Sequence, residues 1–425
     1  MSGVLDVSTP SVNEASWAQV ESLRRALHEH SRPTYAARLA ALDALSDRLL
    51  AAGAGDPARR IPGVAFLAAY LRAGNLRALV AREIPTPEAF DRFAPIEDRK
   101  SLRLLPRGVV CHWIAGNVPL LGMFSWALSA LAGNVNVIRL SSRQADFVSP
   151  LLALLADSSA DGARMARETL VLRFEREDEA AHRRMSRVAD VRIAWGGEES
   201  VDAIAALPAR WDCETVVFGP RVSLAVVDPA LATDGTLARL VTDIVYFDQL
   251  ACSSPQRVFV KGRPGHPAFD RFVDRFTAVF QQQSRATPRQ PLNFSETYRI
   301  HLDRTRALLE GASVRCDEQT QWTVAISAAP IASLTCMNRF VEIVPFDDVA
   351  DLGPRMPSQV QTAVTLLEGD DLERFSLIGA WRGVCRFPRP GDGNSFENPW
   401  DGVPLISRLT RWVTRTDARE AIGRE

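Results

Sequence analysis

Two hydrophobic periods alternate along the middle of the chain, and together they predict a series of strands and helices. Short runs rich in β-branched residues are typical of buried strands, whereas apolar positions that recur every three or four residues are typical of helices. The first elements are a strand at 107–114, a turn at 115–117, a helix at 118–132 and a second strand at 135–140. This order predicts a parallel β–α–β unit with a right-handed crossover.

The same alternation continues as far as residue 219. The predicted order is helix 144–158, strand 169–174, helix 178–189, strand 191–196, helix 198–208 and strand 215–219. Strand–helix alternation of this length predicts a doubly wound parallel sheet of the nucleotide-binding type. In such sheets the ligand lies beyond the carboxyl ends of the strands, so polar residues at those ends are the first candidates for a site.

The segments on either side of this alternation differ from it. Residues 14–104 carry helical spacing broken by turns, and a second α/β pattern begins near residue 223. In that second pattern we expect helices at 236–248 and 268–283, and strands at 257–262, 322–327 and 340–346. We therefore expect four parts: an N-terminal helical part (1–104), a Rossmann-like nucleotide-binding domain (105–222), a second α/β domain (223–404) and a C-terminal tail (405–425).

Composition narrows the class of protein. The chain has 425 residues and 46% hydrophobic content, which is enough for two packed domains. Its 50 basic and 51 acidic residues leave a net charge of −1, which argues against a nucleic-acid partner. The longest apolar stretch, 118–133, is shorter than the roughly 20 residues that span a bilayer, and residues 1–17 lack the pattern of a secretion signal. We expect a cytoplasmic protein without a membrane span.

Cysteine is the first candidate for chemistry. The six cysteines are scattered and never form CxxC, so we expect neither a disulfide framework nor a metal site. Cys252, in "YFDQLACSSPQRVFV" (246–260), lies in a predicted turn between a helix and a strand, where reactive groups are often displayed. Its thiolate would attack a carbonyl or a thioester. The alternative is that Cys252 packs as a small apolar residue.

Polar residues follow the first two strands of the predicted sheet. Asn117, in "HWIAGNVPLL", either caps the next helix or donates its amide to a developing oxyanion. Arg139, Ser141 and Ser142, in "VIRLSSRQ", either bind a nucleotide ribose or its 2′-phosphate, or belong to a solvated loop.

A glycine pair and a carboxylate complete the candidates. Gly196 and Gly197 in "WGGEES" open a helix, where a phosphate can approach bare backbone N–H groups, although the chain contains no GxGxxG motif. Glu342, in "NRFVEIVPF", either faces solvent on one side of a strand or accepts hydrogen bonds from ribose hydroxyls.

Five of these segments occur together in a recognisable order. Between about residues 105 and 405, "GNVPLL", "WGGEES", "FGPRVSLAVV", "DQLACSSPQRVFV" and "WDG" resemble the aldehyde dehydrogenase superfamily. More closely, they resemble its long-chain acyl-CoA reductase family, which includes the reductase component of bacterial bioluminescence fatty-acid reductase. The resemblance implies an aldehyde-dehydrogenase-like α/β fold, with a Rossmann-type cofactor domain and a second α/β domain that carries the nucleophilic cysteine.

The resemblance also implies a catalytic role for some of these residues. Cys252 matches the nucleophile, Asn117 matches the oxyanion-hole donor, and Glu342 matches a glutamate that contacts the nicotinamide ribose. Gly196 and Gly197 match the start of the helix that lies against the cofactor diphosphate.

Two departures from the superfamily pattern refine this expectation. Arg139 stands where many members hold the adenosine ribose with lysine, and a permanent cation beside Ser141 and Ser142 favours NADPH, with NADH as the alternative. Aldehyde-oxidising members have a glutamate that activates water where this chain has Phe218. Because phenylalanine cannot deprotonate water, an acyl group on Cys252 is expected to persist until a hydride reaches it.

The expected function is therefore the NADPH-dependent reduction of an acyl-CoA or acyl-carrier-protein thioester to an aldehyde through an acyl–cysteine intermediate. The expected protein partners are further copies of the chain or an acyl-supplying enzyme. Two alternatives stay open on the sequence alone. One is a cofactor-independent cysteine acyltransferase or thioesterase, although none of the six histidines lies in a Cys–His signature. The other is a non-catalytic scaffold member of the family.

Overall fold

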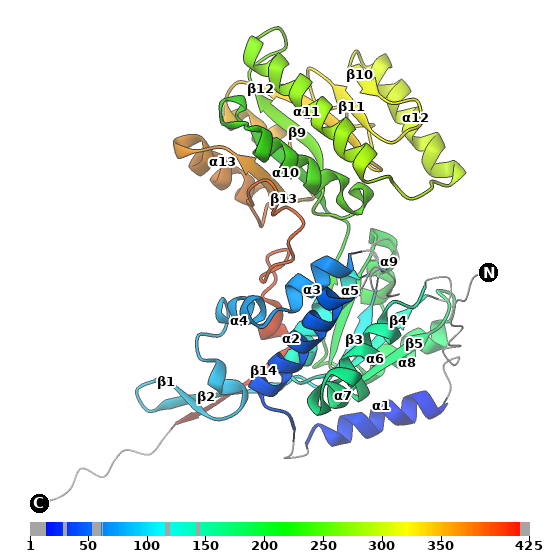
Figure 1. Cartoon of the computed structure of the whole chain (residues 1–425). Coiled ribbons are helices and arrows are strands. Elements are labelled where there is room, and N and C mark those ends of the chain that lie inside the picture. The colour runs from blue at the N-terminus through cyan, green and yellow to red at the C-terminus, as the bar shows by residue number, and fades with distance from the viewer. Residues whose placement is uncertain are drawn as a thin grey trace, which may run out of the picture. The chain divides into compact units, whose positions relative to one another are not determined.

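The structure, a computed structural model, describes residues 14–28, 32–52, 61, 63–114, 120–141 and 145–416. The chain forms two compact units (Figure 1). Unit 1 comprises Met1–Gly219 and Phe396–Glu425, and unit 2 comprises Pro220–Ser395. The four parts expected from the sequence remain predictions about domains, and each unit is described here by itself.

Unit 1 is built on a five-stranded parallel sheet with the order β5-β4-β3-β6-β7. Its strands are β3 (Val109–Trp113), β4 (Val135–Leu140), β5 (Thr169–Arg173), β6 (Val191–Trp195) and β7 (Glu214–Phe218). The first strand of this sheet in the sequence is the central strand β3. The next two, β4 and β5, are added on one side of β3, and β6 and β7 are added on the other side. The predicted doubly wound sheet is thereby confirmed, and its order reverses beside β3, where such sheets bind their ligands.

Helices cover both faces of this sheet. The helices of unit 1 are α1 (Glu14–Ala26), α2 (Tyr35–Ala51), α3 (Val64–Leu71), α4 (Ala73–Ala81), α5 (Leu121–Leu131), α6 (Val148–Ser158), α7 (Ala160–Arg167), α8 (Glu179–Val188), α9 (Glu198–Ala205) and α14 (Leu405–Arg408), with the 3₁₀ turn η2 (Pro87–Phe90). Buried residues of α1, α8 and α9 pack in one apolar cluster with alternate residues of β3 and β4. No single helix among those described has both the length and the apolar character to span a bilayer, although α3 and α4, bent by 66°, pass that test as a pair on length and composition.

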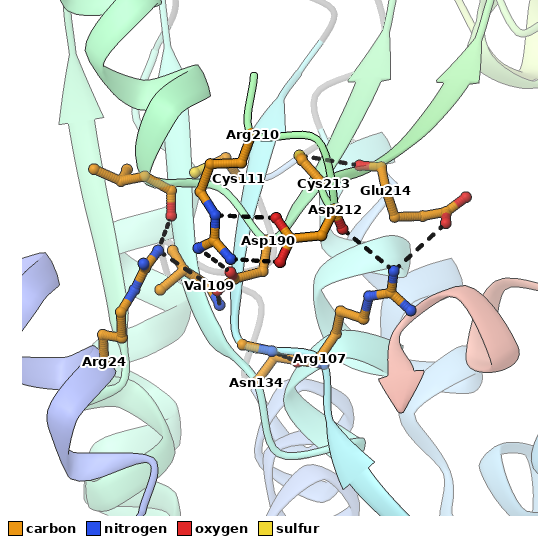
Figure 2. Close-up of polar contacts among 12 residues, drawn as sticks. Arg24, Arg107, Val109, Cys111, Asn134, Asp190, Arg210, Asp212, Cys213 and Glu214 are labelled. Carbon is orange, nitrogen blue, oxygen red and sulfur yellow. Dashed lines mark hydrogen bonds and ion pairs between the residues drawn. The ribbon is translucent and has the colours of Figure 1, made fainter. Parts of the chain in front are cut away.

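A polar network at the amino end of β3 holds the central strand in place (Figure 2). The Asp190 carboxylate accepts hydrogen bonds from the Val109 backbone N–H at 2.7 Å and from Arg210 at 2.8 Å. The Asn134 side chain accepts the Gly108 N–H at 2.9 Å. Gly108 has a φ of 143°, and a Cβ at this position would overlap the Asp190 carboxylate. The strand therefore begins where a glycine lets backbone and carboxylate approach closely.

A separate antiparallel sheet in unit 1 has the order β1-β2-β14. Its strands are β1 (Ala94–Glu97), β2 (Lys100–Pro106) and β14 (Thr410–Thr416). The sequence predicted helices broken by turns over residues 14–104 and missed β1 and β2. The physical reason is that β2 pairs along its whole length with β14, which lies some 300 residues later in the chain. A local window of sequence carries no information about such a partner.

Unit 2 contains a six-stranded sheet with the order β10-β11-β12-β9-β8-β13, parallel except for the edge strand β10. Its strands are β8 (Val222–Val227), β9 (Pro255–Lys261), β10 (Ser313–Cys316), β11 (Thr323–Ile326), β12 (Phe340–Phe346) and β13 (Val360–Leu366). Its helices are α10 (Asp234–Val245), α11 (Pro267–Ala286), α12 (Phe294–Leu309) and α13 (Gly369–Trp381), with 3₁₀ turns η3 (Pro229–Leu231), η4 (Tyr246–Gln249) and η5 (Val349–Arg355). α10 and α11 pack on one face of the sheet, and α13 and η5 on the other.

The helix predicted at 236–248 ends earlier than expected. α10 stops at Val245, and the next residues Phe247, Asp248 and Gln249 have φ angles of 55°, 52° and 61°. A run of left-handed residues without glycine is costly, so side-chain interactions must hold it in place. This reversal turns the chain toward the start of β9 and places Cys252 on the connection.

Candidate active site

Cys252 lies at the tip of a tight turn that leads into β9. The Ser254 N–H donates to the Ala251 carbonyl at 3.0 Å, which makes Cys252 the second residue of a β-turn. The Cys252 carbonyl accepts the Ser223 hydroxyl at 2.6 Å, from the second residue of the neighbouring strand β8. The Cys252 side chain is half-buried, and no disulfide forms among the six cysteines, all of which lie in described residues. The turn therefore carries a cysteine of intermediate exposure on a held backbone.

Gln249 joins both ends of this turn to the start of β12. Its side-chain nitrogen donates to the carbonyls of Pro255 and Phe340, each at 2.9 Å, and its side-chain oxygen accepts the Phe340 N–H at 2.8 Å. The amide is buried, so these three bonds satisfy groups that would otherwise be costly to remove from water. Gln249 is a support residue that sequence reasoning missed, because two of its three bonds are to the backbone of Phe340, some 90 residues away.

An ion pair stabilises the left-handed run that precedes the turn. Asp248 lies 2.6 Å from the guanidinium of Arg339, which is buried and also donates to the Thr287 carbonyl at 2.7 Å. Burial lowers the pKa of Arg339, and the charge of Asp248 opposes that effect. Left-handed residues cost about 1–3 kcal/mol each, so the Gln249 and Asp248 contacts explain how this conformation persists.

Glu342 lies fully buried inside the sheet of unit 2. One carboxylate oxygen is 2.5 Å from Nε of Arg257, and the other accepts the Ser327 hydroxyl at 2.6 Å and the Ile331 N–H at 2.9 Å. Because its exposed fraction is 0%, the alternative in which Glu342 faces solvent is wrong. Both oxygens already accept strong donors, so the ribose contact that the family resemblance implies remains a prediction and would have to share one of them.

Cys252 and Glu342 lie at the same edge of this sheet. Cys252 stands three residues before β9, and Glu342 is the third residue of β12, the parallel neighbour of β9. Both therefore lie toward the amino ends of the strands. This edge is the opposite of the one that parallel sheets commonly use for ligands, so the strand-end rule would not have found it.

The candidate cofactor residues of unit 1 gather at the carboxyl edge of its sheet, as expected. Arg139 lies in β4 and Ser141 follows it, while Gly196 and Gly197 lie between β6 and α9. Gly197 is the N-cap of α9, and a Cβ built on it meets nothing within 4 Å. The N-cap of α9 is thus open at the Cβ position, although Glu198 and Glu199 make the first turn acidic. Two further predicted residues, Asn117 and Ser142, lie outside the described residues.

The Arg139 guanidinium is held on one side by Phe174. One terminal nitrogen donates to the Phe174 carbonyl at 2.9 Å, and the guanidinium carbon lies 5.3 Å from the centre of the Phe174 ring. Burial lowers the pKa of Arg139 from its ordinary value, and the guanidinium remains charged at neutral pH. The Ser141 carbonyl accepts a bond from Arg173 at 3.2 Å, so a second arginine lies at this edge.

Phe218 ends β7 and is buried. Its ring stacks on Trp195 with 4.0 Å between ring centres and 22° between the planes, and the Trp195 indole N–H donates to Ser125 at 3.3 Å. The position where aldehyde-oxidising relatives carry a water-activating glutamate is therefore part of an apolar aromatic pair in unit 1.

Comparisons with known proteins agree with this architecture. The family model described as acyl-CoA reductase (LuxC) matches residues 26–412. The long-chain acyl-protein thioester reductase of Photorhabdus luminescens is 24% identical over 345 residues, covering 80% of this chain and 70% of that protein. The long-chain acyl-protein thioester reductase 2 of Photobacterium leiognathi is 24% identical over 339 residues, covering 79% and 70%.

Solved structures identify the fold. An NAD-dependent aldehyde dehydrogenase from Sinorhizobium meliloti matches with a TM-score of 0.68 at 15% identity, covering 97% of this chain and 89% of that one. An aldehyde dehydrogenase variant from Bacillus cereus matches with a TM-score of 0.65 at 17% identity, covering 94% and 87%. The expected aldehyde-dehydrogenase-like fold and the family resemblance are both confirmed. The chain belongs to the acyl-CoA reductase (LuxC) family.

Proposed function

We propose that this protein reduces an acyl thioester, carried by CoA or by an acyl-carrier protein, to an aldehyde, with NADPH as the reductant and Cys252 as the covalent carrier of the acyl group. The observation that carries the proposal is the half-buried thiol of Cys252 on a turn whose backbone is held by Ser223 and Gln249. Family membership and the printed names of the curated relatives, which act on acyl-protein thioesters, support the same reaction.

The first step makes the acyl-enzyme. The Cys252 thiolate attacks the thioester carbon, a new sulfur–carbon bond forms, and the original one breaks as the leaving thiolate takes a proton. The Cys252 backbone N–H and the Asn117 amide would stabilise the oxyanion of this step. The held carbonyl of Ala251 supports this role, because it accepts the Ser254 N–H at 3.0 Å and lies in the same peptide plane as the Cys252 N–H, whose direction it therefore fixes.

The second step removes the acyl group as aldehyde. When bound, a reduced nicotinamide supplies the hydride that this step requires. Gly197 at the start of α9 supports a site for the diphosphate of such a cofactor, because it carries no side chain at the N-cap; Glu198 and Glu199 in the same turn would have to point away from the phosphates. Arg139 supports NADPH over NADH, since it keeps a positive charge at the carboxyl end of β4 beside Ser141.

Hydrolysis should compete poorly with reduction. The residue that matches the water-activating glutamate of oxidising relatives is Phe218, which has no proton-accepting group. An acyl group on Cys252 would therefore wait for hydride. A thiol nucleophile also requires a reducing environment, which supports the cytoplasm as the location.

Intact-mass spectrometry tests this proposal. The protein is mixed with a long-chain acyl-CoA, with and without NADPH, and compared with Cys252→Ala and with Cys385→Ala, which removes an exposed cysteine as the matched control. We expect one acyl adduct on wild type and Cys385→Ala, no adduct on Cys252→Ala, and loss of the adduct with release of aldehyde only when NADPH is added.

The other outcomes contradict the proposal in distinct ways. An adduct that clears without NADPH indicates an acyltransferase or thioesterase. No adduct on the wild-type protein indicates a non-catalytic member. Aldehyde formation by Cys252→Ala would show that another group carries the chemistry.

A further inference from the structure

The two serines that follow Cys252 share one hydrogen-bond acceptor. The hydroxyls of Ser253 and Ser254 lie 2.7 Å and 3.3 Å from Oδ1 of Asn394. All three side chains are buried. Asn394 comes some 140 residues later, in the turn-rich segment "GDGNS" at 391–395, so no local sequence signal connects it with the nucleophile.

The other end of the Asn394 amide is also fixed. Its nitrogen donates to the backbone carbonyl of Asp243 at 2.7 Å, near the end of α10. The Asp243 carboxylate in turn accepts the N–H groups of Gly391 at 2.7 Å and Gly393 at 3.2 Å. The residues just before Asn394 and the Asn394 amide itself are thus tied to Asp243 of α10, which restricts the movement of Asn394.

Glycine at these two positions is what permits the close approach. Gly391 has a φ of 100°, and a Cβ there would lie 2.9 Å from the Arg239 side chain. A Cβ on Gly393 would lie 3.0 Å from the Asp243 carboxyl carbon. The absence of a side chain at both positions therefore lets the backbone N–H groups of this segment reach the Asp243 carboxylate of α10.

The Asn394 contacts are not needed for the turn at Cys252 to form. The bond between Ser254 N–H and the Ala251 carbonyl already closes the turn, and Ser223 already satisfies the Cys252 carbonyl. The Asn394 contacts add a third fixed point, on the side chains just after the nucleophile. Three separate anchors restrict the rotation of the turn as a whole, and with it the direction of the thiol and of the backbone N–H groups.

We propose that Asn394 is a positioning residue for Cys252, which acts through the hydroxyls of Ser253 and Ser254 to hold the thiol in the orientation that attacks the thioester. The inference rests on the proposed function in that Cys252 is taken as the nucleophile. Small misplacements of a reacting group can cost about 100-fold in rate, so a hydrogen bond far from the substrate can control the reaction.

Two readouts of Cys252 reactivity test the proposal. One is the acylation rate with acyl-CoA in the absence of NADPH. The other is the rate of alkylation by iodoacetamide across a pH series, with the modified cysteine located by peptide mapping. For Asn394→Ala and for the double change Ser253→Ala with Ser254→Ala, we expect about a 10-fold to 100-fold slower acylation, a shifted pH profile of alkylation and a lower kcat, with an unchanged KM for NADPH.

Conservative and control variants separate positioning from general stability. Ser253→Thr keeps the hydroxyl and should acylate within about threefold of wild type. Asn293→Ala removes another asparagine of unit 2, which caps α12 by accepting the Glu296 N–H at 2.9 Å. This control should lower the melting temperature without changing either Cys252 readout.

Several results would overturn the inference. If Asn394→Ala is acylated at the wild-type rate, whatever its melting temperature, Asn394 has only a structural role and the proposal is wrong. Should Asn394→Ala fail to fold, the serine double variant decides instead, and a wild-type acylation rate in that variant contradicts the proposal. If the wild-type protein itself is never acylated, the proposed function has failed, and an alkylation profile that Asn394→Ala leaves unchanged then rejects the positioning role separately.

Discussion

Glu342 and Arg257 face one another on the neighbouring strands β12 and β9 and form a partly buried ion pair with 2.5 Å between oxygen and nitrogen. The register of the two parallel strands places these residues directly opposite each other. The carboxylate that the family resemblance assigns to the cofactor ribose is therefore first of all the partner of a partly buried arginine. A role of Glu342 in cofactor binding would come in addition to this structural role.

Removing this carboxylate should cost stability even without ligand. Glu342→Ala would leave the partly buried Arg257 without its counter-charge and the Ser327 hydroxyl and Ile331 N–H without their acceptor. We expect a loss of about 3 kcal/mol in the free energy of unfolding, at the low end of the range for a buried pair because Arg257 keeps some exposure. Glu342→Gln keeps the acceptor for Ser327 and should lose less. Urea unfolding of the ligand-free protein measures both. A Glu342→Ala protein as stable as wild type would contradict the ion pair.

Gly197 gives a test of the cofactor helix that does not disturb the fold. Because a Cβ there meets nothing and the residue has a φ of −70°, Gly197→Ala should cost less than about 1 kcal/mol of stability. The added methyl group would occupy space over the first turn of α9, so we expect a higher Kd for NADPH. Fluorescence titration with NADPH and thermal melting separate the two effects. Unchanged NADPH binding would place the diphosphate elsewhere.

Arg139 is expected to discriminate between the two nicotinamide cofactors. Because arginine stabilises a phosphate by charge and hydrogen bonds, Arg139→Ala should raise the KM for NADPH by about 10-fold or more and change the KM for NADH little. Steady-state kinetics with each cofactor measures this ratio. Arg139→Lys, which keeps the charge, should retain part of the preference. An equal rise in the KM for both cofactors would contradict this role and would show that Arg139 acts structurally, through its bond to the Phe174 carbonyl.

Gly108 tests the network at the start of β3. In Gly108→Ala the new methyl group would displace the Asp190 carboxylate, which would release the Val109 N–H and Arg210, and the φ of 143° would add strain. We expect a loss of about 2–4 kcal/mol by chemical denaturation. The matched control is Gly74→Ala in α4, where a Cβ meets nothing and the change should be neutral or stabilising. Similar losses in the two variants would contradict the proposed overlap.

The stabilities of the two units should depend on pH in opposite directions, because unit 1 buries His112 and unit 2 buries Asp243. His112 lies between Ser125 and Asn136, and burial lowers its pKa to about 4, below the unfolded value near 6.5. Its contribution to stability is therefore present above pH 6.5 and is lost as the pH falls toward 4, by about 3 kcal/mol in total. Burial raises the pKa of Asp243 to about 7, so its contribution is present near pH 4 and is lost as the pH rises through 7.

Hydrogen exchange followed by unit distinguishes these two contributions. Between pH 7 and pH 5, amides of β3 and β4 in unit 1 should lose protection relative to those of α10 in unit 2, after correction for the intrinsic exchange rate. His112→Gln and Asp243→Asn serve as controls, since each removes one titration. A pH dependence that survives His112→Gln would assign the loss in unit 1 to another group.

The sequence alone determined most of the regular structure and located the candidate nucleophile. Period-two and helical hydrophobic patterns are local, so they predicted all five strands of the unit 1 sheet and the loop position of Cys252. The order of short motifs led to the correct family and fold, because motif spacing is also a property of the linear chain.

Tertiary structure alone decided the features that depend on distant partners. α10 ends at Val245 because Gln249 and Asp248 find acceptors and charges that the chain supplies about 90 residues later. The pairing of β2 with β14, the burial of Glu342 against Arg257 and the contact of Asn394 with the serines after Cys252 have the same origin. A hydrogen bond acts over about 3 Å of space whatever the separation along the chain, so its partner is known only when the chain path is known.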